Sequence, residues 1–213
     1  MVNCLLELIY PHKESCLCCE EDISSFLLCK KCIETISFIK EPYAIEEIND
    51  IKVYSAAYYS GIIKKLIIRF KYKNDFYSGE AISSVLLELI KSRELTGDLI
   101  TYVPISKSSL KKRGFNQCEV ISKFISNEIN IPYYGVLERV KEVNEQKRLH
   151  IEDRKTNMIG VFKVNRDNVI DNKRIILIDD VLTTGATVLS CYKELMKSGA
   201  KEVIILTVSK SNI

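Results

Sequence analysis

The chain contains 213 residues, of which 46% are apolar and 28% are charged, and its formal net charge is +3. This composition is typical of a globular protein with one or two domains, and the small net charge restricts any attraction to nucleic acid to local clusters of basic residues. No segment approaches the roughly 20 consecutive apolar residues of a membrane-spanning helix, and the first residues do not resemble a signal peptide, so we expect a cytoplasmic protein. The glycines and histidines lack the spacing of a dinucleotide-binding loop, a P-loop or a zinc protease motif.

Six of the eight cysteines lie within the first 32 residues. Four of them form two pairs with two intervening residues each, Cys16 with Cys19 and Cys29 with Cys32. Two such pairs can place four thiolates tetrahedrally around Zn²⁺. A disulfide framework is the alternative, but disulfides are rare in a reducing cytosol. We therefore predict a closed, structural zinc site that supports folding and takes no part in chemistry.

The remaining cysteines do not have this spacing. Cys18 lies inside the first pair and can compete as a ligand, and His12 can replace one thiolate. Cys118 and Cys191 fall on the apolar faces of predicted helices, so we expect both in the core.

Residues 1–40 show little regular periodicity apart from the cysteine pairs, and residues 41–50 form an acidic connector that contains a proline. From about residue 51 onward, patterns typical of strands and helices alternate. The predicted strands cover residues 52–59, 99–105, 133–137, 161–164, 174–178 and 202–208, and the predicted helices cover residues 61–73, 81–95, 115–129 and 187–198. Such alternation indicates an α/β fold with a doubly wound, mainly parallel sheet. We predict a zinc-binding module over residues 1–45 and the α/β domain over residues 46–213.

The most distinctive segment is residues 174–188, which read RIILIDDVLTTGATV. A β-branched strand leads to Asp179 and Asp180 and then to a threonine-rich turn that opens a helix. Ligands of open α/β sheets bind beyond the carboxyl ends of the strands, and the N–H groups at a helix N-terminus favour a phosphate. Because two carboxylates nearby can accept hydrogen bonds from vicinal hydroxyls, this order predicts a site for a ribose 5-phosphate. The turn residues are Thr183, Thr184, Gly185, Ala186 and Thr187.

Several motifs together carry a resemblance to a known family. The chain contains FKY at residues 70–72, VPI at 103–105 and KRGFNQ at 112–117, followed by a spaced series that includes Gln146, Arg154 and Asn157. With the cysteine pairs and the segment 174–188, these motifs resemble the ComF family of competence-associated, type I phosphoribosyltransferase-like proteins over nearly the whole chain. For residues 174–188 alone, a solvated acid pair and an ordinary threonine N-cap is the alternative interpretation.

The resemblance implies that the protein binds phosphoribosyl pyrophosphate together with Mg²⁺. Asp179 and Asp180 would then orient the ribose and reach the metal through water. The turn after them would hold the 5′-phosphate.

The resemblance also implies two further loops at this site. One is the loop of residues 105–109, in which Ser106 and Lys107 would face the pyrophosphate. The other is a lid over residues 138–157 that contains Arg139 and closes over the ligand. If ribosyl transfer takes place, the candidate catalytic residues are Asp179, Asp180, Lys107 and Arg139.

Single-stranded nucleic acid is a second candidate partner. Residues 64–73 (KKLIIRFKYK) carry five cations, two aromatic residues and no acid, and basic surfaces with aromatic side chains hold single strands without sequence preference. A solvated helix face is the alternative, and Phe70 is expected in the core. The ComF resemblance implies single-stranded DNA as the partner, together with other DNA-uptake proteins. The candidate contact residues are Lys64, Lys65, Arg69, Lys71, Lys73 and Arg113.

Two hypotheses of function follow from the sequence. The first is a ComF-like protein that binds phosphoribosyl pyrophosphate and single-stranded DNA and acts in DNA uptake during natural transformation. The second is a metabolic phosphoribosyltransferase that transfers ribose 5-phosphate to a small nucleophile, with a purely structural zinc module. Salt-sensitive binding of an oligonucleotide supports the first, and pyrophosphate release with an acceptor supports the second.

Overall fold

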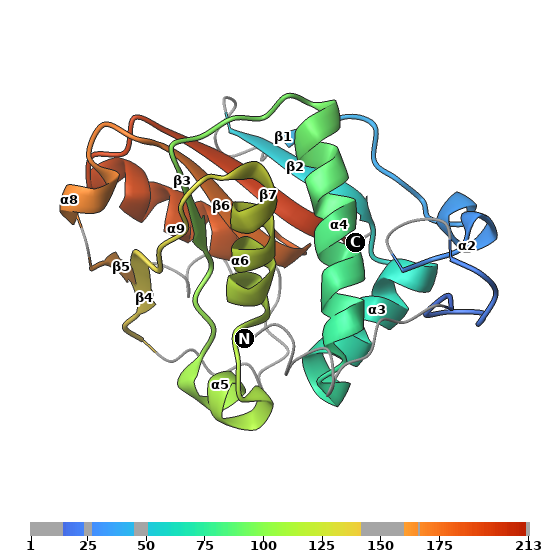
Figure 1. Cartoon of the computed structure of the whole chain (residues 1–213). Helices are drawn as coiled ribbons and strands as arrows, with labels where there is room; N and C mark the ends of the chain where they lie inside the picture. The colour runs from blue at the N-terminus through green and yellow to red at the C-terminus, as the bar shows by residue number, and fades with distance from the viewer. Residues whose placement is uncertain (1–14, 24–26, 45–50, 142–159, 166, 212–213) are drawn as a thin grey trace, which may run out of the picture.

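The chain forms an α/β fold around a five-stranded sheet (Figure 1). The computed structural model describes residues 15–23, 27–44, 51–141, 160–165 and 167–211. The strand order is β1-β2-β7-β6-β3, in which β1 is antiparallel to β2 and all other neighbours are parallel. The strands are β1 (Tyr43–Ala44), β2 (Lys52–Tyr58), β7 (Glu202–Lys210), β6 (Arg174–Leu182) and β3 (Leu99–Tyr102).

The two central strands, β6 and β7, pair along their whole length. Their register runs from Arg174 opposite Glu202 to Leu182 opposite Lys210. Both strands are rich in buried isoleucine, leucine and valine, as is typical of parallel strands that are covered on both faces. Because β7 continues to pair, β6 extends through the acid pair to Leu182, whereas the sequence predicted an end at residue 178.

Helices cover both faces of this sheet (Figure 1), which confirms the predicted fold class. On one face lie α3 (Gly61–Lys73), α4 (Phe76–Ser92) and α6 (Gln117–Ile129). On the other face lie α9 (Ala186–Lys197), α8 (Asp167–Ile170) and a two-stranded sheet of β4 (Leu137–Arg139) and β5 (Phe162–Val164). Within the described ranges, no helix has the length and apolar character needed to cross a membrane.

The cysteine-rich segment packs against α3. Leu28 and Cys29, which precede the short helix α2 (Lys30–Glu34), belong to the same buried cluster as Leu66 of α3. The Ile39 N–H donates a hydrogen bond of 3.0 Å to the carbonyl of Ala56 in β2. The described part of this segment therefore shares its core with the sheet, and a domain boundary at residue 45 stays a prediction.

Residues 105–109, expected as a loop, lead into a short helix instead. This helix, α5 (Lys107–Arg113), begins after Ser106, whose hydroxyl accepts a hydrogen bond from a backbone N–H in the first turn. It ends at Gly114, which has a φ of 80°, a left-handed conformation that glycine adopts without steric cost. The serines and the basic residues of this segment have no strong apolar periodicity, so the pattern alone did not reveal the helix.

The helix predicted over residues 81–95 and the strand predicted over residues 133–137 also differ from the structure. Helix α4 begins at Phe76 rather than at residue 81, because the Asp75 side chain accepts a hydrogen bond from the Ser78 N–H and caps the helix. The strand expected over residues 133–137 is absent from that described segment. Only Tyr133 bridges to β3, and β4 starts at Leu137.

Candidate functional site

The acid pair of β6 lies near the edge at which the parallel strands end. Strands β3, β6 and β7 are parallel neighbours, so their carboxyl ends meet at this edge. The Val103 N–H, just after β3, donates to the carbonyl of Ile178 at 3.0 Å. Asn116 Nδ2 in turn donates to the carbonyl of Val103 at 3.1 Å. These two bonds hold the start of α6 beside Asp179 and Asp180.

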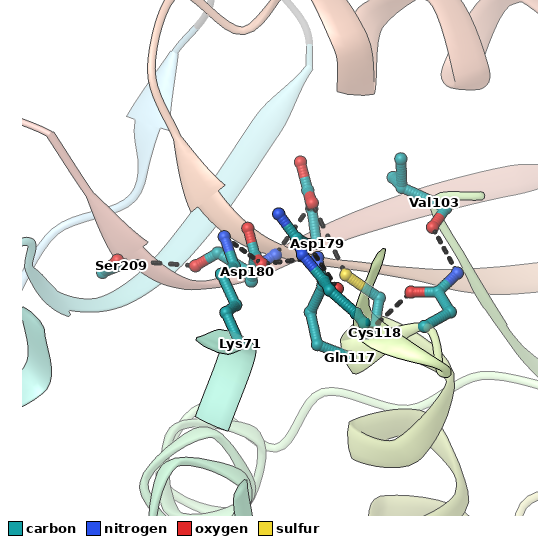
Figure 2. A network of polar contacts seen from close by, with 9 residues as sticks. Lys71, Val103, Gln117, Cys118, Asp179, Asp180 and Ser209 are labelled. Carbon is teal, nitrogen blue, oxygen red and sulfur yellow. Dashed lines mark hydrogen bonds and ion pairs between the residues drawn. The ribbon is translucent and has the colours of Figure 1, made fainter. Parts of the chain in front are cut away.

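Asp180 is buried, and side chains from two helices converge on it (Figure 2). Lys71 Nζ of α3 lies 2.5 Å from Asp180 Oδ2. Gln117 Nε2 of α6 donates to the same oxygen at 2.7 Å. The Ser209 hydroxyl of the neighbouring strand β7 donates to the Asp180 carbonyl at 3.4 Å. The carboxylate thus has a charged partner and a neutral partner inside the protein.

Lys71 is the charged partner of this carboxylate, and its side chain is only 15% exposed. Burial by itself lowers the pKa of Lys71, but the attraction of Asp180 outweighs it, and the pKa lies above its ordinary value. Lys71 therefore carries a positive charge inside the acid cluster at neutral pH. The sequence placed this lysine on a nucleic-acid surface, whereas the structure places its ammonium at the acid pair.

Asp179 has different surroundings from Asp180. Its Oδ1 accepts a hydrogen bond of 2.8 Å from the Asp180 N–H, and the Cys118 thiol approaches the same oxygen at 3.6 Å. Desolvation, and then the negative charge of Asp180, raise the pKa of Asp179 to about 7. Burial and the neighbouring Asp180 thus favour the protonated form of Asp179, which has no lysine within ion-pair distance among the described residues.

The threonine-rich turn lies directly between β6 and α9. Gly185 precedes the first residue of α9 and has a φ of 79°, which favours glycine. Thr184 Oγ1 accepts a hydrogen bond of 3.5 Å from the Ala186 N–H, and Thr183 is exposed while Thr187 is half-buried. Because α9 is 12 residues long, its first N–H groups and these hydroxyls offer a surface suited to an anion.

The other predicted ligand residues lie on neighbouring elements. Ser106 is buried and uses its hydroxyl to cap α5, whereas Lys107 is the exposed first residue of that helix. Arg139 ends β4, and its Nε donates to the carbonyl of Lys141 at 3.3 Å. The rest of the predicted lid, residues 142–157, lies outside the described residues.

The four predicted metal ligands come together. The sulfur atoms of Cys16, Cys19, Cys29 and Cys32 all lie within 4.8 Å of one another. Four sulfurs around one Zn²⁺ with Zn–S distances of about 2.3 Å stand about 3.8 Å apart, so the set fits a tetrahedral metal ion such as zinc. The Cys18 N–H donates to Cys16 Sγ at 3.4 Å, so Cys18 supports the cluster through its backbone. His12 lies outside the described residues.

Helix α3 attaches this cysteine cluster to the sheet domain. Arg69 Nη1 donates to the carbonyl of Leu17 at 2.6 Å, and Lys65 Nζ donates to the carbonyl of Cys18 at 3.4 Å. Arg69 also forms an ion pair with Asp75. Two of the predicted nucleic-acid residues therefore contact the cysteine segment.

The remaining predicted nucleic-acid residues lie on two elements. Lys64 and Lys73 are exposed on α3. Arg113 of α5 donates to Gln117 Oε1 at 2.9 Å, and its guanidinium carbon lies 5.3 Å from the centre of the Tyr72 ring. We call Tyr72, Lys112 and Arg113 the Tyr72 platform, because Lys112 Nζ also lies 5.7 Å from this ring and Tyr72 is 57% exposed.

Sequence reasoning assigned no site role to Gln117 or Cys118. Both lie in the first turn of α6, and Cys118 was expected only as a core residue, which its burial confirms. The motif KRGFNQ contained the available signal, because Asn116 caps α6 and Gln117 reaches the acid pair.

Comparison with known proteins extends these observations. Residues 115–212 match the family model "Phosphoribosyl transferase domain". The chain is 26% identical over 220 residues to "Competence protein F" of Haemophilus influenzae. The alignment covers 99% of this chain and 96% of that protein. It is 30% identical over 145 residues to "Competence protein ComFC" of Streptococcus pneumoniae, and the alignment covers 68% of this chain and 62% of that protein. It is 27% identical over 158 residues to "DNA utilization protein YhgH" of Escherichia coli, and the alignment covers 71% of this chain and 69% of that protein.

The parallel sheet, the acid pair at the end of β6 and the turn into α9, together with this match, define a phosphoribosyl transferase domain of type I. Within that class, the chain belongs to the family of Competence protein F, ComFC and YhgH homologues. The resemblance stated from the sequence motifs is thereby confirmed.

Proposed function

We propose that the carboxyl end of β6 binds phosphoribosyl pyrophosphate with Mg²⁺. The observation that carries this proposal is the direct succession of a polar acid pair, a turn with a left-handed glycine and the N-terminus of a 12-residue helix. The turn from Thr183 to Thr187 supplies donors for the 5′-phosphate. Asp179 supplies an acceptor for the ribose hydroxyls on the strand side of that phosphate.

In this assignment the diphosphate lies toward α5 and β4. Lys107 and Arg139 are the cations that we assign to its negative charge. Mg²⁺, when bound, neutralises the diphosphate further, and the acid pair holds the hydrated ion from the protein side. A preorganised set of charges is also what an oxocarbenium-like transfer reaction with a diphosphate leaving group needs.

Calorimetric titration with phosphoribosyl pyrophosphate and Mg²⁺ tests this site. We expect the wild-type protein to bind and the double variant Asp179→Asn with Asp180→Asn to lose binding while it keeps its zinc content. Asp171→Asn is the matched control, because Asp171 is exposed just before the amino end of β6. Unchanged affinity in the double variant would remove the assignment.

We also propose that the protein contacts single-stranded DNA through the Tyr72 platform and acts in DNA uptake during natural transformation. An exposed aromatic ring flanked by two cations suits base stacking next to a phosphate backbone. The names of the relatives, which refer to competence and to DNA utilization, support a partner of this kind.

Fluorescence anisotropy with a labelled single-stranded oligonucleotide tests this surface. We expect Tyr72→Ala and Lys112→Ala each to weaken binding, and the loss from Tyr72→Ala to correspond to about 1–3 kcal/mol. Tyr134→Ala is the matched control, because Tyr134 is 41% exposed on another part of the molecule. Affinity that does not change with salt concentration would contradict a contact with the phosphate backbone.

A metabolic phosphoribosyltransferase is the second candidate, and the match to the phosphoribosyl transferase domain favours it. In that case a small nucleophile takes the ribosyl group and pyrophosphate is released. Pyrophosphate release with an added acceptor, without oligonucleotide binding, would replace the first proposal by the second.

We propose a structural zinc ion for the four-cysteine cluster. The close approach of Cys19 Sγ to Cys29 Sγ (3.4 Å) and to Cys32 Sγ (3.5 Å) supports it. With four protein sulfurs as ligands, the ion keeps no open position for a substrate. Its role is therefore to hold the cysteine-rich segment against α3.

A further inference from the structure

Lys71 stands apart from the other lysines of α3. Lys64, Lys65 and Lys73 are exposed, whereas the Lys71 side chain is 15% exposed. Its ammonium ends 2.5 Å from Asp180 Oδ2, on β6. Figure 2 shows Lys71 reaching from the last turn of α3 toward the strand that carries the acid pair.

The carboxylate that Lys71 contacts is held from a second side as well. Gln117 donates to the same Oδ2 at 2.7 Å, and Arg113 fixes Gln117 through a hydrogen bond of 2.9 Å to its Oε1. The Arg113 guanidinium in turn lies over the ring of Tyr72, the residue next to Lys71. The contacts form a closed ring through α3, β6, α6 and α5, so the position of Asp180 is determined by several elements at once.

From this arrangement we propose that Lys71 is a positioning residue of the acid pair and not a nucleic-acid contact. It holds the Asp180 carboxylate toward α3 and α6, which leaves Asp179 as the acid that meets the hydroxyl groups of the ligand. This inference rests on the proposed function of the site. A buried carboxylate without its counter-charge is unfavourable, and next to Asp179 it would also repel a second carboxylate. Removal of the lysine therefore disturbs both acids.

Chemical labelling of lysines tests the ion pair without any ligand. The full-length protein is treated briefly with an amine-acetylating reagent, and modification of each lysine is measured by mass spectrometry. We expect Lys73 to react and Lys71 to be protected in the wild-type protein, and Lys71 to become reactive in Asp180→Asn. Equal reactivity of Lys71 and Lys73 in the folded wild-type protein would overturn the proposal.

Ligand titrations test the positioning role. In metal sites, loss of a group that orients a metal-holding residue costs about 10–100-fold in metal affinity or activity. Because the acid pair is proposed to hold Mg²⁺, Lys71→Gln should weaken the binding of phosphoribosyl pyrophosphate and Mg²⁺ by at least about tenfold. Lys71→Arg keeps the charge and should recover part of the affinity, a rescue that a merely structural role does not predict. Lys123→Gln on α6, an exposed lysine, is the control and should bind as the wild type does.

Oligonucleotide binding by the same variants completes the test. Lys71→Gln should leave the affinity for a single-stranded oligonucleotide unchanged, whereas Lys73→Gln should lower it. If Lys71→Gln instead weakens only oligonucleotide binding, the lysine is a nucleic-acid contact and the inference is wrong. If the wild type does not bind the sugar diphosphate, the proposed function fails, and the labelling experiment still decides whether Lys71 belongs to the acid pair.

Discussion

The guanidinium of Arg69 donates a hydrogen bond of 2.6 Å to the backbone carbonyl of Leu17, between Cys16 and Cys19. Arg69 simultaneously pairs with Asp75, which caps α4. A single side chain of α3 thereby joins the cysteine cluster to the helix layer of the sheet domain. A residue that the sequence assigned to nucleic acid is placed where it connects two parts of the fold.

Replacement of Arg69 by methionine should therefore destabilise the protein. The variant leaves the Leu17 carbonyl and the Asp75 carboxylate without this partner, and such losses cost about 1–3 kcal/mol for a buried group. Urea denaturation measures the free energy of unfolding, and transfer of zinc to a colorimetric chelator measures the stability of the cluster. Lys64→Met, an exposed lysine on the same helix, is the control, and equal effects of both changes would contradict the connecting role of Arg69.

Loss of one cysteine should release the proposed zinc ion. Cys29→Ser removes one of four ligands, and we expect zinc stoichiometry to fall together with the melting temperature, because binding free energy at a structural site is also folding free energy. Metal analysis and thermal unfolding check both. Cys18→Ser is the matched variant and should keep its zinc, since Cys18 contacts the cluster through its backbone N–H and its sulfur is not one of the four that lie together. Full zinc content in Cys29→Ser would contradict the four-cysteine site.

The acid at position 179 should lower stability when it ionises. Its pKa is raised from 3.8 to about 7 in the folded protein, so the folded state binds more protons than the unfolded state between these values, and stability falls as pH rises through this window. Asp179→Asn removes that cost. We expect its melting temperature to exceed the wild-type value at pH 8, without added magnesium, and to approach it near pH 4. A difference that does not vary with pH would show that Asp179 titrates at its ordinary pKa.

Replacement of Gly79 by a residue with a side chain should destabilise the folded protein. A Cβ at this position would lie 2.7 Å from Cε2 of Phe70, a buried ring that also packs against Phe76 and Phe115. Overpacking costs about 1–3 kcal/mol, whereas alanine gains only about 1 kcal/mol of helix propensity over glycine. Gly79→Ala should thus lower the free energy of unfolding in urea. Glu80→Ala, one residue further on the exposed side of α4, is the control, and a stabilised Gly79→Ala protein would show that the Phe70 ring moves freely.

Local patterns in the sequence predicted much of the fold, because helix and strand periodicity arise from which side of an element is buried. Helix 61–73 was predicted with the observed bounds, and Phe70 was placed in the core correctly. The errors came from contacts that are distant in the sequence or polar in character. Strand β6 continues past residue 178 because β7 pairs with it, and α5 depends on the Ser106 cap rather than on an apolar stripe.

In the candidate sites, too, features that are contiguous in the sequence were predicted, whereas contacts between distant residues were not. Each cysteine pair and the order of strand, acid pair and turn are contiguous in the chain, so the sequence alone predicted the four-cysteine cluster, the family and the place of the proposed ligand site. The partners of the acids come from α3 and α6, and their approach depends on how these helices pack on the sheet. Only the tertiary structure decided that Lys71 meets Asp180 while Asp179 faces Cys118, because a charge pattern along one helix does not specify which lysine is directed inward.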